Sequence, residues 1–334
     1  MDLRFGITLS NRGVLLGMCT PRDLLHMADA AEACPLIDSV WVGDALFVNR
    51  RLDALTLLAA VAGRTERVLL GPACMGSFAL REPRAFAYEW ASLDVLSGGR
   101  TRLVACAGGG GDAAWQAESR ALGQDPGDRR RRMIEHMQVL RHLWTHDQAP
   151  FEGRFYRFSG VTLEPKPLQS PCPIWLSSNA QRLASGVAGV GGSELALGRV
   201  GKFGDGWMTH SLSPAEFAAG WQRIQAAAAA ADRAGAVDDN ALYHHINIGP
   251  DADAALDDSK RFLDLYYGAN YSRERLRSWG CFGTPGQCIA ALRAFRGSGC
   301  RRIALRVSTM GDGMEQFRRL TEEVLPFVNE GEPE

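Results

Sequence analysis

Residues 81–111 read REPRAFAYEWASLDVLSGGRTRLVACAGGGG, and this stretch predicts a helix, a turn and a strand in succession. Pro83 suits the first turn of a helix, because its missing N–H has no helical partner to lose there. Apolar residues then recur at spacings of three and four, the period of one buried helix face, at Phe86, Trp90, Leu93 and Leu96. Gly98–Gly99 ends the helix, and Thr101–Cys106 follows as a short strand. The four glycines at 108–111 indicate a backbone that bends sharply or approaches a ligand closely, with a loop of no special role as the alternative.

Strand and helix alternate in the same way along the rest of the chain. The predicted strands are Leu3–Leu9, Ser39–Gly43, Arg67–Cys74, Thr101–Cys106, Pro173–Ser178, Asp205–Thr209, Leu242–Ile248 and Arg302–Val307. The further predicted helices are Pro21–Ala33, Asp53–Thr65, Arg129–Trp144, Pro214–Ala234, Asp251–Tyr267, Pro285–Arg296 and Gly313–Val328. Eight alternations without an internal repeat favour an α/β fold of the closed (β/α)8 type, a TIM-like barrel, over an open doubly wound sheet.

We expect one domain over residues 1–334, since barrels of this class routinely reach this length. Two segments exceed what the barrel needs. Residues 149–160 alternate aromatic and polar side chains around Gly153, which predicts a hairpin added outside the barrel. Residues 179–204 are rich in glycine in their first half and are predicted to form a mobile loop, as a lid or a phosphate loop.

Charge and composition narrow the class of partner. Lysine and arginine total 37 against 38 acidic residues, and no basic block stands apart from an amphipathic helix, so neither nucleic acid nor an anionic membrane is expected. No apolar run is long enough for a signal peptide or a membrane span. The eight cysteines form no CxxC pair and no metal-finger spacing, so we expect no bound metal and a reduced, cytoplasmic protein. A small molecule is the expected partner.

Other enzyme classes lack their signature residues here. The chain has three lysines, none on a predicted strand, so a Schiff-base aldolase has no nucleophile. No HxH motif ends the first strand, which argues against a metal hydrolase. A GxSxG elbow, a complete Walker P-loop and a GxGxxG nicotinamide site are also absent.

In such a barrel the active site lies at the carboxyl ends of the strands. The side chains predicted to stand there are Thr8, Asn11, Asp44, Cys74, Met75, Cys106, Ser177, Ser178, Asn179, His210, Arg306 and Ser308. Asp44 is either a cap for the next segment or a carboxylate aimed at the ligand. Cys106 is either buried packing or a reactive thiol, with no basic side chain beside it in the sequence. The turn 177–179 offers hydroxyl, amide and backbone N–H groups to a phosphate, and His210 is either a pH-active group or a solvent-exposed loop residue.

Seven blocks of sequence, in this order along the chain, resemble the luciferase-like flavin monooxygenase family. They are VWVGDAL at 40–46, RTERVLLG at 64–71, LDVLSGGR at 93–100, GDRRRRMIEHMQVLRHLW at 127–144, FEGRFYRF at 151–158, PKPLQ at 165–169 and FGDGWM at 203–208. The resemblance spans nearly the whole chain. It implies a TIM-like barrel that binds reduced FMN, or the deazaflavin coenzyme F420, at its strand ends.

The resemblance also implies roles for individual residues. It implies a non-proline cis peptide at Cys74–Met75 that supports the middle ring of the flavin, and it places Cys106 near the reactive edge of the ring. Thr8 and the turn 177–179 are expected contacts of the coenzyme. Many members have a histidine beside the ring where this chain has Ala45, so Asp44 and His210 become the candidates for catalytic proton chemistry.

The implied function is a flavin-dependent oxidoreductase, first of all a monooxygenase that uses reduced FMN and O2 on a small organic substrate. A separate flavin reductase is the implied source of the reduced FMN. The alternatives are an F420-dependent enzyme that transfers hydride without oxygen, and a flavin- or ligand-binding barrel without turnover, which Ala45 favours. Relatives commonly pair through helices beside the second and third strands, so a homodimer or higher homo-oligomer is expected, with Trp41, Phe47 and Trp90 as candidates for core or interface.

Overall fold

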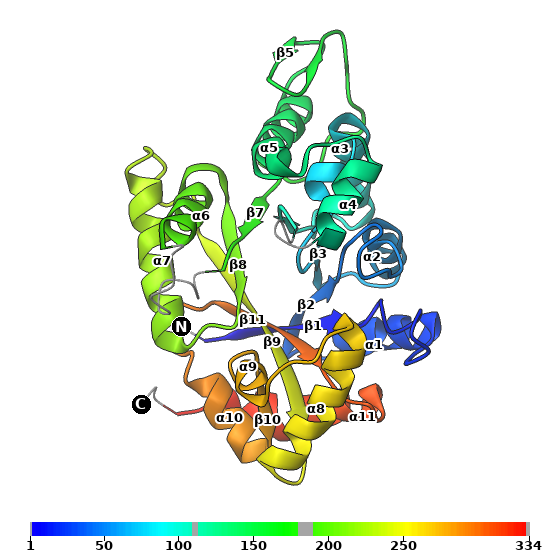
Figure 1. Cartoon of the computed structure of the whole chain (residues 1–334), viewed down its shortest axis with the longest axis vertical. Coiled ribbons are helices and arrows are strands. Elements are labelled where there is room, and N and C mark those ends of the chain that lie inside the picture. Colours follow the sequence, from blue (N-terminus) through cyan, green and yellow to red (C-terminus); the bar gives the residue numbers. More distant parts are fainter. Residues whose placement is uncertain (1, 109–112, 180–189, 332–334) are drawn as a thin grey trace.

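The computed structural model describes residues 2–108, 113–179 and 190–331, and its centre is a ring of eight parallel strands (Figure 1). These strands are β1 (Arg4–Leu9), β2 (Ile37–Val42), β3 (Leu69–Pro72), β4 (Leu103–Ala105), β7 (Ile174–Ser177), β8 (Gly206–His210), β9 (Asp239–Ile248) and β11 (Arg302–Val307). Hydrogen bonds join them in the order β3, β2, β1, β11, β9, β8, β7 and β4. Parallel bridges at Leu70–Thr101 and Met75–Ala105 then connect β3 to β4. The predicted (β/α)8 barrel is therefore confirmed.

Helices form the outer layer of the barrel. They are α1 (Pro21–Ala33), α2 (Ala54–Ala62), α3 (Pro83–Leu96), α5 (Arg129–Thr145), α6 (Val190–Phe203), α7 (Pro214–Ala229), α8 (Ala252–Tyr267), α10 (Pro285–Arg293), α11 (Gly313–Arg319) and α12 (Leu325–Val328), with a π-helical turn at Leu320–Val324. Capping boxes at Thr20, Ser213 and Thr284 start three of them, each followed by a proline. Within the described ranges, no helix combines the length and the apolar character that crossing a bilayer requires.

Five short elements have no counterpart among the predicted ones. They are the 3-10 turns Phe78–Leu80 and Pro126–Asp128, helix α4 (Ala113–Ala121), helix α9 (Arg273–Arg277) and strand β10 (Gly280–Gly283). Strand β10 pairs with the second half of β9, beyond the part of β9 that pairs with β8. Its sequence GCFG is half glycine, so it carries little strand signal. The predicted loop at 179–204 is helical over α6, and residues 180–189 lie outside the described residues.

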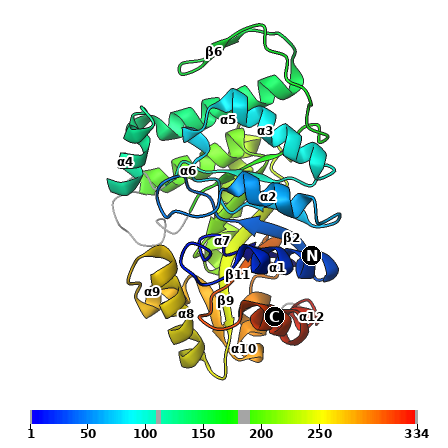
Figure 2. The same cartoon turned by 90° about the vertical axis from the view of Figure 1, so that its right-hand side faces the viewer.

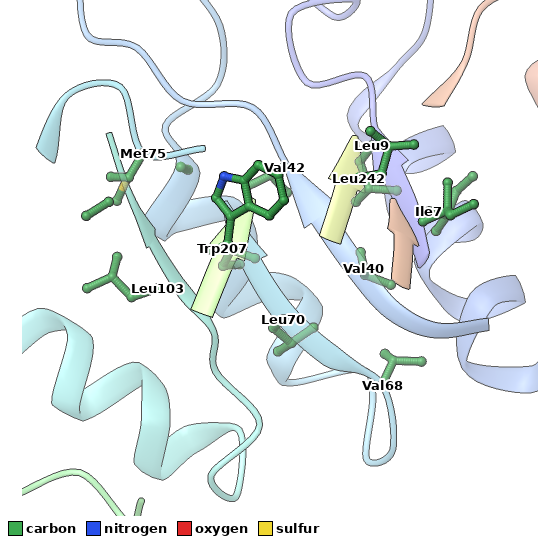
Figure 3. Close-up of a cluster of buried hydrophobic side chains, with 14 of the residues drawn as sticks. Ile7, Leu9, Val40, Val42, Val68, Leu70, Met75, Leu103, Trp207 and Leu242 are labelled. Atoms are coloured by element: carbon green, nitrogen blue, oxygen red, sulfur yellow. The ribbon is translucent and has the colours of Figure 1, made fainter. Parts of the chain in front are cut away.

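The barrel strands carry a separate apolar cluster on each face, because successive side chains of a strand point to opposite sides. The larger cluster packs the strands against the helices, and Figure 3 shows part of it, including Ile7, Leu9, Val40, Val42, Leu70, Met75, Leu103, Trp207 and Leu242. The smaller cluster fills the barrel interior with Trp41, Val104, Trp175, Met208, Ala241, Tyr243 and Ala304. The barrel is therefore a packed core beneath whatever site its rim forms.

Two tryptophans take up much of the barrel interior. The rings of Trp41 and Trp175 lie 6.1 Å apart, and both side chains are buried. Glycines on the strands make room for them, since a Cβ at Gly6 would stand 2.6 Å from Trp41 Nε1, and a Cβ at Gly206 would collide with the Trp175 indole. These glycines are therefore required by close packing and not by turn geometry.

An ion-pair network ties the amino ends of four strands together. Arg302 on β11 is fully buried, and its Nη2 lies 2.9 Å from Asp38 on β2, while its Nη1 lies 3.0 Å from Asp239 on β9. Arg4 on β1 adds a contact of 3.2 Å to Asp239. The network lies at the end of the barrel opposite to the rim that forms the site.

A small hairpin of β5 (Phe151–Glu152) and β6 (Arg157–Phe158) lies where residues 149–160 are predicted to form one. The carboxylate of Glu135 on α5 accepts hydrogen bonds from the backbone N–H groups of residues 154, 155 and 156 at 3.1, 2.7 and 2.8 Å. Figures 1 and 2 both place the hairpin beyond α5 at the edge of the molecule, away from the barrel centre.

Candidate active site

A cavity of about 280 Å³ lies at the carboxyl ends of the barrel strands. Strand ends around the ring supply its walls, together with residues from the segment after β2, from α4, from the end of α8 and from the residue before β10. The lining residues are Gly43, Asp44, Asn49, Arg51, Ala73, Cys74, Gly76, Cys106, Gly108, Trp115, Ser177, Met208, Thr209, His210, Tyr243, Tyr267, Trp279 and Arg306. We call this space the central cavity.

Asp44 follows β2, and among the described residues its carboxylate bonds to the turn after β3 and not to the segment that follows Asp44 itself. It lines the central cavity, and its carboxylate accepts a hydrogen bond of 2.7 Å from the backbone N–H of Ser77. Arg81 lies 3.4 Å from the same carboxylate and also pairs with Asp53. Burial raises the pKa of Asp44, and Arg81 and Ser77 offset part of that effect. Asp44 therefore shapes the wall while it holds the turn that follows β3.

Two thiols face each other across the ends of β3 and β4. Cys74 and Cys106 both line the central cavity and are hydrogen-bonded to each other. The bond from Cys74 lowers the pKa of Cys106, and the N–H of Gly108 at 3.3 Å and the guanidinium of Arg129 lower it further. The pKa of Cys74 is raised well above its usual range by its bond to Cys106 and by burial. Cys106 is thus the thiol of the pair that ionises more readily.

The cation near Cys106 comes from a distant part of the chain. Arg129 at the start of α5 is buried, and its guanidinium donates to the carbonyl oxygens of Ala107 at 2.7 Å and Gly76 at 3.0 Å. It also pairs with Glu118 of α4 at 3.5 Å and stacks over the Trp115 ring. One side chain therefore holds the ends of β3 and β4 and the helix α4 in place.

The structure places three features predicted for the coenzyme site differently from the prediction. The cis peptide lies at Ala73–Cys74 and not at Cys74–Met75. Met75 is fully buried in the apolar cluster outside the barrel (Figure 3), because the alternation of side chains that turns Cys74 inward turns Met75 outward. Thr8 lines a neighbouring cavity of about 580 Å³ between α1, α8 and α11, and not the central cavity.

The turn after β7 divides its side chains between the cavity and the scaffold. Ser177 lines the central cavity, whereas the hydroxyl and carbonyl oxygens of Ser178 accept from Trp207 Nε1 at 3.0 Å each. Asn179 Nδ2 lies 3.2 Å from the ring of His210. The predicted phosphate contact of this turn stays a prediction, because the next residues lie outside the described ranges.

His210 at the end of β8 lines the central cavity and does not stand in open solvent. Burial lowers its pKa to about 4, with a further contribution from the charge of Arg275. Its Nδ1 lies 2.9 Å from the Ser211 hydroxyl. The imidazole is therefore neutral near pH 7 and serves there as a hydrogen-bonding group.

Aromatic residues of the wall come from outside the strand ends and have no signal in the sequence pattern. Trp115 lies on α4, Tyr267 ends α8, and Trp279 directly precedes β10. Tyr243, which also lines the cavity, lies on β9 away from the carboxyl end of that strand, and Arg306 lies near the end of β11. A sequence-based prediction that considers strand ends alone therefore includes Arg306 and misses the aromatic side chains of the cavity.

The walls fit a flat acceptor-rich coenzyme. Buried polar atoms of Thr209 and Arg306 have no hydrogen-bond partner among the described residues, so the β8 and β11 side of the cavity offers hydrogen-bonding groups to a bound molecule. Cys74, Cys106 and Ser177 would hold the ring of such a coenzyme on the β3, β4 and β7 side. The described part of the chain contains no cluster of three His, Cys, Asp or Glu side chains with metal-binding geometry.

Stability is expected to fall in mild acid because several histidines are buried in the neutral form. Burial lowers the pKa of His210 and of His244 to about 4, and that of His136 to about 3. Below an unfolded pKa of about 6.5 the unfolded chain therefore binds protons that the folded chain does not, so this contribution is complete above that pH and is lost as the pH falls towards 4. Each histidine lowers the free energy of unfolding by roughly 1.4 kcal/mol per pH unit in this window.

Urea unfolding at about pH 7.5, 6 and 5 measures this dependence. The variant His244→Leu, which removes one of the buried imidazoles, should show a shallower decline than the wild type. A stability that stays flat between neutral pH and about pH 5 would contradict the account.

Three comparisons place this geometry among known proteins. A family model described as luciferase-like monooxygenase matches residues 3–302. The chain is 26% identical over 343 residues to an F420-dependent glucose-6-phosphate dehydrogenase of Amycolatopsis mediterranei, covering 92% of this chain and 94% of that protein. An FMNH2-dependent dimethylsulfone monooxygenase of Pseudomonas putida is 32% identical over 141 residues, covering 41% of this chain and 36% of that protein. The solved structure of an F420-dependent secondary alcohol dehydrogenase has a TM-score of 0.80 at 20% identity, covering 98% of this chain and 99% of that chain, and shares the fold.

Proposed function

The chain belongs to the luciferase-like monooxygenase family, and from that premise we propose that its central cavity binds reduced FMN and that the protein oxygenates a small organic substrate with O2. One observation carries the choice of reaction. Asp44 is already bonded to Ser77 and Arg81, and His210, whose pKa is lowered to about 4, is only a weak base. Oxidation of an alcohol by hydride transfer needs a base for the hydroxyl proton, whereas oxygenation leaves the difficult chemistry to the coenzyme.

The residues of the cavity have defined tasks under this proposal. Cys74, Cys106 and Ser177 contact one edge of the ring, and Cys106 presents its more acidic thiol there. Trp115 and Tyr267 exclude water from the other parts of the wall. When bound, reduced FMN supplies the electrons that activate O2, and a separate flavin reductase is the proposed supplier of the reduced coenzyme.

An F420-dependent hydride transfer is the second candidate. The F420-dependent relative from Amycolatopsis mediterranei matches almost the full length of both chains, which supports this coenzyme, while the FMNH2-dependent relative matches less than half. The acceptance of a substrate proton by His210, in its neutral form, is the step that this candidate requires. A barrel that binds the coenzyme without turnover is the remaining alternative.

Turnover with each coenzyme separates the candidates. Photoreduced FMN is offered with O2 and a panel of small organic substrates, and substrate-dependent product formation with O2 uptake is the expected result. F420 is offered without O2 to the same panel, and its reduction is followed by absorbance. Product from F420 alone would replace the proposed reaction by the second candidate, and binding of either coenzyme without product would support the non-catalytic alternative.

We also propose a homodimer formed through α2 and α3, the helices beside the second and third strands. Trp41 and Trp90 are fully buried within the single chain, so they belong to the core, whereas Phe47 is 59% exposed. On α3, Tyr88 and Leu96 are exposed as well. Light scattering during size-exclusion chromatography tests the assembly, and a monomer at micromolar concentration would contradict it.

A further inference from the structure

Arg306 is a buried cation in the wall of the central cavity. It lies on β11, is 1% exposed, and lines the cavity. Its guanidinium stands 4.7 Å from the Tyr266 ring centre and 5.7 Å from that of Tyr243. Both rings therefore lie within the range of a cation–π contact with the guanidinium.

The charge of Arg306 has no carboxylate partner within 4 Å among the described residues. Its Nη1 donates to the Ser10 hydroxyl at 3.3 Å, the guanidinium is also hydrogen-bonded to the Tyr266 hydroxyl, and its Nε has no partner in the described part of the chain. A buried cation is costly unless an anion or several acceptors compensate it. The contrast within this molecule is Arg302, equally buried on the same strand, which binds two carboxylates.

Other unpartnered donors lie in the same wall. Trp279 lines the cavity, is 8% exposed, and its indole Nε1, which can only donate, has no partner among the described residues. Thr209 also lines the cavity with an unpartnered hydroxyl. The wall formed by β8, β11 and the residue before β10 therefore carries unpartnered groups of Thr209, Arg306 and Trp279 that can donate hydrogen bonds.

This donor side is separate from the side proposed to hold the coenzyme ring. Strand β4, which leads to Cys106, stands four places from β11 in either direction around the ring of strands. The donor side also carries aromatic rings, since Tyr243 lies on β9 and Tyr267 and Trp279 line the same cavity. The cavity thus has a thiol end and a cationic end.

We propose that Arg306 receives an anionic oxygen group, a carboxylate or a comparable oxyanion, on the organic substrate. A guanidinium matches such a group because two of its N–H groups donate in parallel to two oxygens. Trp279 Nε1 supplies a further donor, and the rings of Tyr267 and Trp279 contact the apolar body of the substrate. The inference rests on the proposed function, because it takes the bound anion to be the organic substrate of that reaction. It deepens the proposal by naming the chemical class of the substrate.

Binding to the protein without coenzyme tests the inference. Calorimetry compares pairs of probes with the same shape and different charge, namely benzoate with benzamide and acetate with acetamide. The wild type is expected to bind at least one anion about tenfold more tightly than its neutral partner. Arg306→Met should remove that preference while leaving the neutral probe unchanged, and Arg306→Lys should restore part of it. Equal affinity for both members of every pair in the wild type overturns the inference, whether or not the variants fold.

Arg51→Met is the matched control, because Arg51 is the other arginine that lines this cavity. It should keep the preference for the anion, and an equal loss in both variants would overturn the assignment to Arg306. Titration with reduced FMN and F420 is run in parallel. If Arg306→Met loses the coenzyme and keeps the anion, Arg306 serves the coenzyme and the inference fails alone. If the wild type binds anions and neither coenzyme, the proposed function fails and the inference stands.

Discussion

Replacement of Cys106 by tryptophan is expected to weaken binding of reduced FMN and of F420 about 100-fold or more, a loss of about 2.7 kcal/mol. Cys106 lines a central cavity of about 280 Å³, and an indole at this position occupies space that the coenzyme ring needs. The effect comes from exclusion of the ring and not from the chemistry of sulfur. Fluorescence titration under anaerobic conditions measures the dissociation constants.

Cys106→Ala is the control for this experiment. It removes the thiol and its bond to Cys74 but leaves the cavity open, so binding should stay within a few-fold of the wild type. Circular dichroism establishes that the tryptophan variant is folded, since overpacking costs about 1–3 kcal/mol of stability. Unchanged coenzyme binding in the folded Cys106→Trp variant would place the ring outside the central cavity.

Arg302→Met is expected to lower the free energy of unfolding by about 3–5 kcal/mol, because it breaks a buried ion-pair network by removing one member. Asp38 and Asp239 would then face each other at the base of the barrel, with Arg4 and Arg102 as nearby cations in the described part of the chain. Strands β1, β2, β9 and β11 would lose the arginine at the centre of the ion-pair network that connects their amino ends. Urea unfolding of the variant and the wild type at pH 7 measures the difference.

The matched control is Arg64→Met, which removes an arginine from the exposed ion pair with Asp29. Exposed pairs contribute little, so its unfolding midpoint should hardly change. A similar, small change in both variants would show that the network at the base of the barrel does not stabilise the fold in the way described.

Local signals explain why the order of the elements could be predicted from the sequence. The capping boxes at Thr20, Ser213 and Thr284 and the prolines after them mark helix starts that depend on a few adjacent residues. The strands are short apolar runs, as strands buried on both faces should be. By contrast, β10 is predictable only from the length of β9, since its glycine-rich sequence has little preference for a strand.

The candidate site was predictable only where it depends on strand ends. Asp44, Cys74, Cys106, Ser177 and His210 lie at the ends of their strands or within two residues of them, and all of them line the central cavity. The prediction was off by one residue after β3, where Met75 lies in the outer core and the cis peptide lies at Ala73–Cys74.

The electrostatics of the site could not be predicted, because they depend on residues far apart in the chain. The cation that acts on Cys106 is Arg129 from α5, which the neighbours of Cys106 in sequence do not indicate. Arg306 is similar, since its lack of a carboxylate partner is visible only when β9, α8 and the segment around Ser10 surround it. Contacts between side chains that are far apart in the chain leave no local sequence pattern from which they could be predicted.

Anaerobic titration of the wild-type protein with reduced FMN and with F420 tests the central claim most directly. The account predicts saturable quenching of coenzyme or tryptophan fluorescence with one site per chain for at least one of the two, and its loss in Cys106→Trp. Absence of saturable binding of both coenzymes to folded protein would contradict the claim that the rim of this barrel is a coenzyme site.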